Sequence, residues 1–400
     1  MIRYIKNRLH LINAFLACIW YGFPGRKLTI IGVTGTDGKT TTTHLTYEIL
    51  KAAGKRVSMV SSVFGLIAGK EHDTGFHVTT PSPWFLQRSM RNAVNHNDQY
   101  FVLEVTSHGL DQNRVWGIPF EIGILTNVTH EHLDYHGNYK KYVATKSKLL
   151  LRSKIAIINR EDESYIHISM NRFIDTKKIK TYGLKKGDTN LKSFSFETPL
   201  PGDYNKLNCL AAATAARELR IADQDIRKGL MAFSGVKGRF ETIKTKHGFD
   251  VIIDFAHTPN ALVRVLSTIA GLSKGRVIHV FGSAGLRDVT KRPMMGAASA
   301  KYADITIITE EDYRTEDVNN IIQQIEEGYK ETVKSMKTDK KQLFKIPKRQ
   351  EAIDQAVLLA DKGDIVVLTG KGHEKSLCRG KTEYPWSDHE GLNHALKRLK

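Results

Sequence analysis

The segment from Gly32 to Thr42 constrains the fold of this chain more than any other. It reads Gly-Val-Thr-Gly-Thr-Asp-Gly-Lys-Thr-Thr-Thr, and it stands between an apolar run at 28–31 and a helix-like segment from His44 to Ala53. A strand, a glycine-rich loop and a helix in this order direct backbone N–H groups and a helix N-terminus at phosphate. The segment therefore predicts an α/β fold with a phosphate-binding loop.

The loop departs from strict P-loop spacing, because Val33 occupies the position of the first glycine. Lys39 is expected to reach the terminal phosphates of ATP, and the Thr40 hydroxyl is expected to bind Mg²⁺. A glycine turn with a chance Gly-Lys-Thr is the alternative, but the flanking strand and helix argue against it. The residues expected to bind the nucleotide in this loop are Gly35, Thr36, Gly38, Lys39, Thr40 and Thr41.

Apolar runs that resemble strands recur along the 400 residues, with helical segments between them. The first set lies at 28–33, 56–60, 100–105, 122–125, 154–158 and 179–182, before an alanine-rich helix at 208–219; the second lies at 249–254, 276–281, 305–309 and 365–369. This alternation predicts mostly parallel sheets covered by helices. We expect an N-terminal apolar and basic helical segment at 1–27, a P-loop-type central ATPase domain at 28–235, and a smaller Rossmann-like, doubly wound C-terminal domain at 236–400.

The composition restricts the class of partner. Lys and Arg number 60 against 42 Asp and Glu, which gives a formal net charge of +18. Such a charge favours anionic partners, but the excess is spread along the chain, so we expect no dedicated binding of nucleic acid. The three cysteines are far apart and fit a reducing compartment without disulfides. We expect a cytoplasmic protein that acts as a monomer.

The first twenty residues combine a basic start at 1–10 with an apolar run at 11–20. That run is about half the length of a membrane span, and no small-residue cleavage site follows it. We therefore expect no integral membrane span. A helix that docks on the body of the protein is favoured, and peripheral contact of residues 1–24 with a membrane is the alternative.

Polar residues gather where predicted strands end, which is where open α/β sheets bind ligands. Glu104 ends a buried strand, where a carboxylate is costly unless it is paired or binds a metal. It is expected to be a second ligand for the Mg²⁺ held by Thr40, and a hydrogen bond to a loop is the alternative. The segment 127–136 contains three histidines and two acids, and one of these histidines is a candidate ligand for a second Mg²⁺.

Further positions admit two interpretations. Lys146 lies in a segment that looks like ordinary helix surface on composition. Asn205 and Asn208 are three residues apart at a helix start and face the same way, which suits either recognition of an adenine edge or helix capping. Asp254 and His257 follow a strand and suit contacts to ribose or phosphate.

The chain resembles the Mur ligase family. The matching segments run in family order from Leu28 to about Asp388, and together they form a very specific combination. They are the threonine-rich loop, Thr79-Thr80-Pro81, and the segments 104–112, 126–137, 238–241, 254–259, 287–293 and 370–374.

The resemblance implies roles for individual residues. Lys39, Thr40, Glu104 and His132 would hold ATP and two Mg²⁺ ions. Lys146 falls where the family has a lysine carbamylated by CO₂, and forming that second-Mg²⁺ ligand requires a transiently neutral amine. Arg287 joins Lys39, Lys146 and His132 as catalytic. The residues implied to contact the nucleotide are Asn127, Asn205, Asn208, Arg239, Asp254 and His257, and those implied to contact the other substrates are Thr79, Thr80, Ser107, Gln112, Arg114, Asp312, Arg314, Gly370 and Glu374.

The resemblance also implies a reaction, the addition of an amino acid to a UDP-N-acetylmuramoyl-dipeptide in peptidoglycan precursor synthesis. The terminal carboxylate of the dipeptide would attack the γ-phosphate of ATP, with two Mg²⁺ and Lys39 neutralising charge. The acyl phosphate would then meet the amine and yield an amide, ADP and phosphate. Closure about a hinge near 234–238 would position the amine.

Three departures from the family affect this expectation. Family members begin with a domain of about a hundred residues that grips UDP, and we expect that domain to be missing, so the acceptor is either held differently or is another, lipid-linked peptide. Asp37 stands where relatives commonly carry Asn. The segment 311–314, Glu-Asp-Tyr-Arg, replaces the Asp-Asn-Pro-Arg of diaminopimelate-adding relatives. Since Arg314 is kept and its guanidinium suits a distal carboxylate, meso-diaminopimelate is favoured over L-lysine.

Two other functions stay open. One is a related ligase that acts on a poly-amino-acid or a folate-like glutamate chain, against which the segments 106–112 and 370–374 argue. The other is a non-catalytic nucleotide-binding homologue, which the presence of every expected catalytic residue disfavours. Release of phosphate that depends on an amino acid, measured with alternative acceptors, separates these possibilities.

Overall fold

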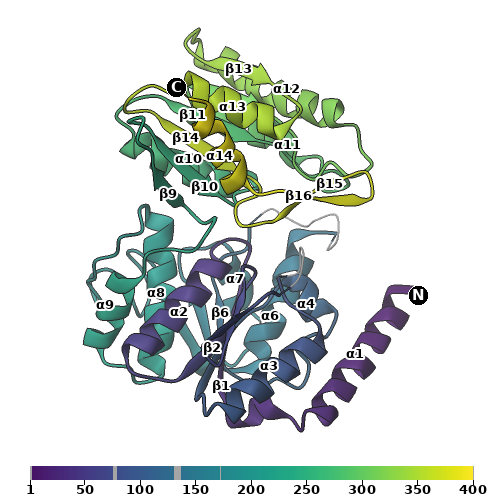
Figure 1. Ribbon diagram of the computed structural model, residues 1–400. Coiled ribbons are helices and arrows are strands. Elements are labelled where there is room, and N and C mark those ends of the chain that lie inside the picture. Colours follow the sequence, from purple (N-terminus) through teal and green to yellow (C-terminus); the bar gives the residue numbers. More distant parts are fainter. Residues whose placement is uncertain (1, 75–78, 130–136, 172, 400) are drawn as a thin grey trace. The chain divides into compact units, whose positions relative to one another are not determined.

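The structure is a computed structural model that describes residues 2–74, 79–129, 137–171 and 173–399 (Figure 1). The chain forms two compact units, Met1–Ser234 and Gly235–Lys400. None of the helices among the described residues has the length and hydropathy that a membrane crossing requires.

The first unit is built on an eight-stranded sheet in the order β4-β3-β2-β5-β1-β6-β7-β8. Six strands are parallel, and the short hairpin β3–β4 pairs antiparallel with β2. All six parallel strands match predicted runs to within about two residues, whereas the hairpin was not predicted, because β4 is fully exposed and lacks an apolar pattern. The strands are β1 (Thr29–Thr34), β2 (Val57–Val60), β3 (Gly65–Ile67), β4 (Lys70–His72), β5 (Tyr100–Glu104), β6 (Phe120–Leu125), β7 (Ser153–Asn159) and β8 (Ile179–Tyr182).

Helices cover both faces of this sheet (Figure 1). On one face α2 (Lys39–Ala52) packs against α8 (Asp203–Glu218) and α9 (Asp223–Ala232). A Cβ atom at Gly229 would lie 2.6 Å from the Cα of Ile49, so the missing side chain lets α9 and α2 approach backbone to backbone. The elements on the other face or in the connections are α3 (Pro83–Asn95), α4 (Ser107–Asp111), α6 (Tyr139–Arg152), α7 (Ser164–Ser169), η1 (Pro24–Lys27) and η2 (Thr176–Lys178).

The N-terminal segment forms helix α1 (Ile2–Trp20), which packs on α3. Ala14, Ala17 and Cys18 are fully buried, and Phe15 meets Trp116 edge to face at 5.6 Å. The expectation of a helix docked on the body of the protein is confirmed.

The second unit carries a six-stranded sheet in the order β13-β12-β11-β14-β10-β9, parallel except for the edge strand β9. Helices α10, α11 and α12 lie on one face, and α13 and α14 supply core residues on the other (Figure 1). The α/β fold class is confirmed. The elements are β9 (Glu241–Lys244), β10 (Asp250–Asp254), α10 (Pro259–Leu272), β11 (Val277–Phe281), α11 (Lys291–Tyr302), β12 (Ile305–Ile308), α12 (Val318–Met336), β13 (Gln342–Lys345), α13 (Arg349–Leu359), β14 (Ile365–Thr369), the hairpin β15 (Ser376–Arg379) with β16 (Thr382–Pro385), and α14 (Asp388–Arg398).

Candidate active site

The register of the first sheet brings polar residues together at the carboxyl ends of its central strands. Strand β1 lies between β5 and β6, and all three run parallel. Val33 pairs with Glu104, and Thr34 pairs with Leu125. The loop after β1, the carboxylate that ends β5 and the polar residues after β6 therefore emerge side by side at the carboxyl end of the sheet, where such folds bind ligands.

The loop from Gly35 to Gly38 is held by the residues that follow β6. Asp37 donates its backbone N–H to Asn127 Oδ1 at 2.9 Å, and its carbonyl accepts from Asn127 Nδ2 at 3.1 Å and from Thr126 Oγ1 at 2.6 Å. Lys39 Nζ donates to the carbonyl of Thr36 at 2.7 Å, so the amine lies over the loop. The side chain of Asn127, a residue expected to contact the nucleotide, therefore holds this loop in place.

Both glycines of the loop adopt backbone conformations that side chains disfavour. Gly35 has φ of +154° and Gly38 has φ of +80°. A Cβ atom at Gly35 would lie 1.8 Å from Thr126 Oγ1, and one at Gly38 would lie 2.3 Å from Asn208 Oδ1. The loop therefore approaches both neighbours so closely that neither site has room for a side chain.

This close approach predicts a specific effect of Gly38→Ala, for which Gly54→Ala is a matched control. Gly54 also has positive φ, +70°, but open space around its Cβ position. Both variants carry the left-handed backbone cost of about 1–2 kcal/mol, whereas only Gly38→Ala displaces Asn208. We expect Gly38→Ala alone to weaken ATP affinity by about tenfold or more, measured by calorimetry. Equal affinities in the two variants would contradict this prediction.

Hard oxygen atoms converge beside the start of α2. Thr40 Oγ1 donates to Glu104 Oε1 at 3.1 Å and lies 2.9 Å from Ser62 Oγ. Glu104 Oε2 accepts the backbone N–H of Ser62 at 2.8 Å. Thr40 and Glu104 are almost fully buried. Hydroxyl and carboxylate oxygens are the ligands that Mg²⁺ prefers, so this set fits a magnesium ion. Ser62 was missed, because a lone serine after a strand carries no motif.

Lys146 is buried, so its interpretation as ordinary helix surface is wrong. The side chain is 1% exposed. Its Nζ donates to the carbonyl of Gly35 at 2.6 Å and lies 4.5 Å from the centroid of the Tyr142 ring. Tyr142 in turn accepts from Thr36 Oγ1 at 3.3 Å. Helix α6 thus brings an amine to the phosphate-binding loop, which composition alone does not reveal.

Asn205 and Asn208 lie in the first two turns of α8, and both are buried. Asn208 Nδ2 donates to Asn205 Oδ1 at 3.3 Å, and Asn208 Oδ1 accepts from Thr42 Oγ1 at 3.4 Å. Gly202 is the N-cap of this helix, so the capping interpretation of the pair is wrong. The amides lie beside α2 and the phosphate-binding loop.

A second polar cluster joins the end of β5 to α4. Thr80 Oγ1 accepts the backbone N–H of Thr106 at 2.9 Å, and the Thr80 carbonyl accepts from Arg114 Nη1 at 2.6 Å. Arg114 also donates to Gln112 Oε1 through Nε and Nη2. Ser107 is buried at the first position of α4.

The other predicted site residues of the first unit are less informative. Thr79 and Thr41 are half-buried, and His132 lies outside the described residues.

In the second unit Asp254 ends β10 and is buried. It accepts the backbone N–H groups of Phe240 at 2.6 Å and Ala256 at 2.7 Å. Burial raises the pKa of Asp254 against the opposing effects of Arg239 and these N–H groups. Arg239 stacks over the Phe255 ring at 4.4 Å, and His257 meets the same ring at 4.6 Å. These three predicted nucleotide contacts therefore form one cluster.

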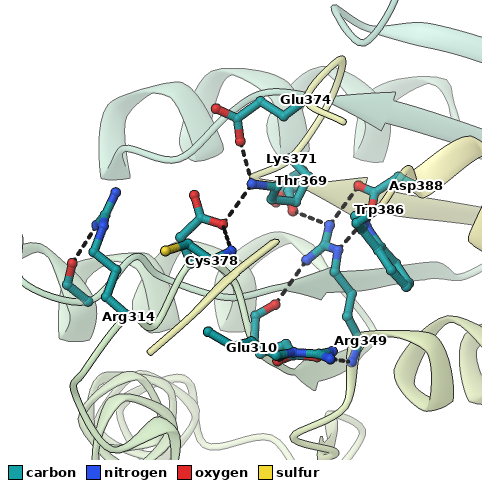
Figure 2. Close-up of polar contacts among 12 residues, drawn as sticks. Glu310, Arg314, Arg349, Thr369, Lys371, Glu374, Cys378, Trp386 and Asp388 are labelled. Carbon is teal, nitrogen blue, oxygen red and sulfur yellow. Dashed lines mark hydrogen bonds and ion pairs between the residues drawn. The ribbon is translucent and has the colours of Figure 1, made fainter. Parts of the chain in front are cut away.

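Two of the residues expected to contact substrate, Asp312 and Glu374, pair with Lys371, which is fully buried (Figure 2). Lys371 Nζ lies 2.9 Å from Asp312 Oδ1 and 2.5 Å from Glu374 Oε2. Burial by itself would lower the pKa of Lys371, but Glu374 and Asp312 outweigh it and raise that pKa above its usual value. Asp312 also accepts the backbone N–H of Cys378 at 2.9 Å.

Arg314 is held in a left-handed conformation at φ of +52° by backbone pairing with the β15 hairpin. Its Nη1 donates to the carbonyl of Gly285 at 2.6 Å (Figure 2). Gly370 has φ of +100°, and a Cβ atom there would lie 2.8 Å from Glu311 Oε2. Arg287, expected to be catalytic, is exposed on the loop before α11.

A buried ion network not predicted from the sequence supports this region. Arg349 and Asp388 are both fully buried, and they pair through two hydrogen bonds of 2.7 Å (Figure 2). Arg349 also donates to the carbonyl of Thr369, which is the last residue of β14. Arg379 pairs with Glu310 at 2.5 Å. Because the partners are far apart in sequence, no local pattern indicates them, and their contacts fix the strand ends next to Lys371.

Family models match most of the chain. The model described as Mur ligase middle domain matches residues 33–216, and the model described as Mur ligase, glutamate ligase domain matches residues 238–372. Among curated relatives, a protein of Clostridium acetobutylicum named UDP-N-acetylmuramoyl-L-alanyl-D-glutamate--2,6-diaminopimelate ligase 1 is 36% identical over 96% of this chain and 82% of its own length. A relative of Roseiflexus sp. named UDP-N-acetylmuramyl-tripeptide synthetase is 35% identical over 96% of this chain and 81% of its own length.

Solved structures of related ligases share the fold of this chain. A structure of a UDP-N-acetylmuramoyl-L-alanyl-D-glutamate--2,6-diaminopimelate ligase aligns with a TM-score of 0.61 and 29% identity, over 92% of this chain and 78% of that chain. A Mycobacterium tuberculosis folylpolyglutamate synthase complexed with ADP and AMPPCP aligns with a TM-score of 0.71 over 90% of this chain and 92% of that chain, but its 16% identity shows the fold alone. The chain belongs to the Mur ligase family of ATP-dependent, Mg²⁺-using ligases.

Proposed function

We propose that this chain adds meso-diaminopimelate to UDP-N-acetylmuramoyl-L-alanyl-D-glutamate at the expense of ATP, as a cytoplasmic monomer in peptidoglycan precursor synthesis. The observation that carries the proposal is the 36% identity over 96% of the chain to a relative named for that reaction. The position of Lys39 over the loop and the pairing of Thr40 with Glu104 support the proposal, because Mg²⁺ prefers hydroxyl and carboxylate ligands.

In this proposal the residues of the first unit divide the work on ATP. Lys39 and the backbone N–H groups of the loop hold the terminal phosphates. Thr40, Glu104 and Ser62 would hold one Mg²⁺, and Lys146, as its carbamate, would hold a second together with His132. When bound, the two ions neutralise charge on the transferred phosphoryl group. Thr80, Ser107 and Arg114 orient the peptide so that its carboxylate meets the γ-phosphate in line.

The residues of the second unit are proposed to select the incoming amino acid. Arg314 recognises the distal carboxylate of diaminopimelate through bidentate, charge-assisted hydrogen bonds. Asp312 and Glu374 both pair with the buried Lys371. Their carboxylates are the proposed acceptors for the distal ammonium group. L-Lysine has no distal carboxylate, so it would leave the Arg314 guanidinium unpaired. The amine then displaces phosphate from the acyl phosphate and forms the amide.

The test is phosphate release by the purified chain with ATP, Mg²⁺ and UDP-N-acetylmuramoyl-L-alanyl-D-glutamate, with the product identified by mass spectrometry. We expect kcat/KM to be about a hundredfold or more higher with meso-diaminopimelate than with L-lysine. Arg314→Leu should raise the KM for diaminopimelate about 10- to 100-fold and leave the KM for ATP unchanged. Arg398→Leu, at an exposed pair with Asp354, is the matched control.

Three outcomes would count against the proposal. Turnover with lysine alone would overturn the role of Arg314. Turnover only with a folate-like or poly-glutamate acceptor would identify a related ligase of different specificity. ATP binding without turnover on any acceptor would indicate a non-catalytic homologue.

A further inference from the structure

Helix α1 has two apolar faces of different character. The inner face consists of the small, fully buried residues Ala14, Ala17 and Cys18, and it packs on α3. The outer face carries large side chains that are between 44% and 75% exposed. They are Leu9, Ile12, Phe15, Leu16, Ile19 and Trp20. The docking of α1 on the first unit therefore uses its small residues and leaves its large ones in contact with solvent.

The outer face forms a continuous stripe. At 3.6 residues per turn, positions 9, 12, 16 and 19 follow one line along the helix. A single exposed apolar side chain is ordinary in a monomer, but a stripe of six on one helix marks an interaction surface. Among the described residues of the first unit, the contacts of α1 are with α3 and Trp116 and not with the nucleotide-binding loop, so the proposed ligase reaction does not explain this surface.

Aromatic side chains gather at the C-terminal end of the stripe. The Trp84 ring lies 6.4 Å from Trp20 and 6.3 Å from Tyr21, edge to face in both contacts. Trp84 Nε1 donates to Asn13 Oδ1 at 2.8 Å. Trp and Tyr side chains of this kind, apolar with a polar end, are the ones enriched where a bilayer meets water.

The charged residues of α1, η1 and α3 all have one sign. The first 36 residues contain no Asp or Glu and five Lys or Arg, at positions 3, 6, 8, 26 and 27. Helix α3 adds Arg88 and Arg91 and also contains no acid. Lys6, Arg8, Arg26, Lys27 and Arg88 are exposed. An apolar stripe bordered by positive charge complements a surface that is negative outside and apolar inside.

We propose that the outer face of α1 binds the surface of an anionic lipid bilayer, with the helix axis in the plane of the membrane. Interfacial helices combine an apolar face that includes Trp, Phe and Leu with Lys and Arg at the border, and their binding grows with buried apolar area and with lipid charge. A second copy of the chain does not fit as well, because pairing two such faces would bring positive borders together. The helix is also not long and apolar enough to cross a membrane.

The experiment is flotation of the full chain with vesicles of phosphatidylcholine alone or with about one-third phosphatidylglycerol, an amount that gives a strongly negative surface. We expect the wild-type chain to float with the anionic vesicles and to remain unbound with the neutral ones. High salt should weaken the binding because it screens the surface charge. Trp fluorescence should shift to the blue when Trp20 leaves water.

Two sets of variants separate the apolar and charged contributions. The triple variant Ile12→Gln, Leu16→Gln and Ile19→Gln should lose about tenfold or more in partitioning, whereas Met231→Gln, Leu272→Gln and Leu358→Gln, which are exposed elsewhere, should not. Lys6→Glu with Lys27→Glu should lose about tenfold or more on anionic vesicles, and Lys340→Glu with Lys381→Glu should lose much less. Circular dichroism confirms that each variant is folded.

The inference is overturned if wild-type protein does not float with anionic vesicles, or if the α1 variants float as well as the controls. It is also overturned if light scattering shows a dimer that the triple variant dissociates, since a second copy then covers the stripe. Because flotation requires neither ATP nor an acceptor, its failure is distinguishable from a failure of the ligase assay.

Discussion

Replacing Lys39 with alanine is expected to lower the rate of ATP-dependent amide formation by about 10²–10³-fold. The amine lies over the loop, held by the Thr36 carbonyl at 2.7 Å, which is where we propose that the terminal phosphates bind. In the variant, the charge that develops on the transferred phosphoryl group would lose the stabilisation that this ammonium group provides. The measurement is kcat from phosphate release at saturating ATP and acceptor.

Lys51→Ala is the matched control for this prediction. Lys51 lies near the C-terminal end of the same helix, with a side chain that is 62% exposed and 3.9 Å from Glu48. An exposed pair of this kind contributes at most about 1 kcal/mol, so the control should keep its rate and its melting temperature. A Lys39→Ala variant that retains most of the wild-type rate would exclude Lys39 from phosphate stabilisation.

Replacing Lys146 with methionine is expected to reduce kcat by about 10²–10³-fold. The proposed carbamate supplies a negatively charged oxygen ligand for the second Mg²⁺, and methionine supplies none. Lys146→Arg should be equally impaired, because arginine keeps a cation near the Gly35 carbonyl but does not form a carbamate. Partial recovery of the methionine variant with millimolar acetate, which restores a free carboxylate, would support the same role.

A spectroscopic readout distinguishes a carbamate from a merely structural lysine. In ¹³C-bicarbonate the wild-type chain should show a carbamate carbon signal that both Lys146 variants lack. Lys148→Met, on the same helix and in a partly exposed pair with Asp111 at 3.4 Å, should keep both the signal and the rate. If Lys146→Arg retains the wild-type rate, then the positive charge suffices and the carbamate is not required.

The sequence predicted the parallel strands well for a physical reason. A strand buried on both faces needs a continuous apolar run, and such runs are visible locally, as at β1 and β14. The hairpin β3–β4 was missed because its outer strand is solvent-exposed, short and charged. Edge strands are held by pairing with a neighbour rather than by a pattern of their own.

The site was predicted unevenly for the same reason. Lys39 and Thr40 belong to a contiguous motif whose backbone geometry depends on adjacent glycines, so sequence sufficed to place them. Ser62 and Tyr142 approach the loop from other elements, and nothing near them in sequence indicates this. Composition made Lys146 look like helix surface, and only the resemblance to a family suggested otherwise.

By itself the sequence determined that the chain has an α/β fold with a phosphate-binding loop, because apolar periodicity and glycine spacing are local properties. The tertiary structure decided which distant side chains share one environment. Sheet register set Glu104 beside Thr40, and the fold of α6 carried Lys146 to the Gly35 carbonyl. The tertiary structure also decided which face of α1 is buried. Both faces are apolar in sequence, but the small residues pack closely on α3, so the large ones remain outside.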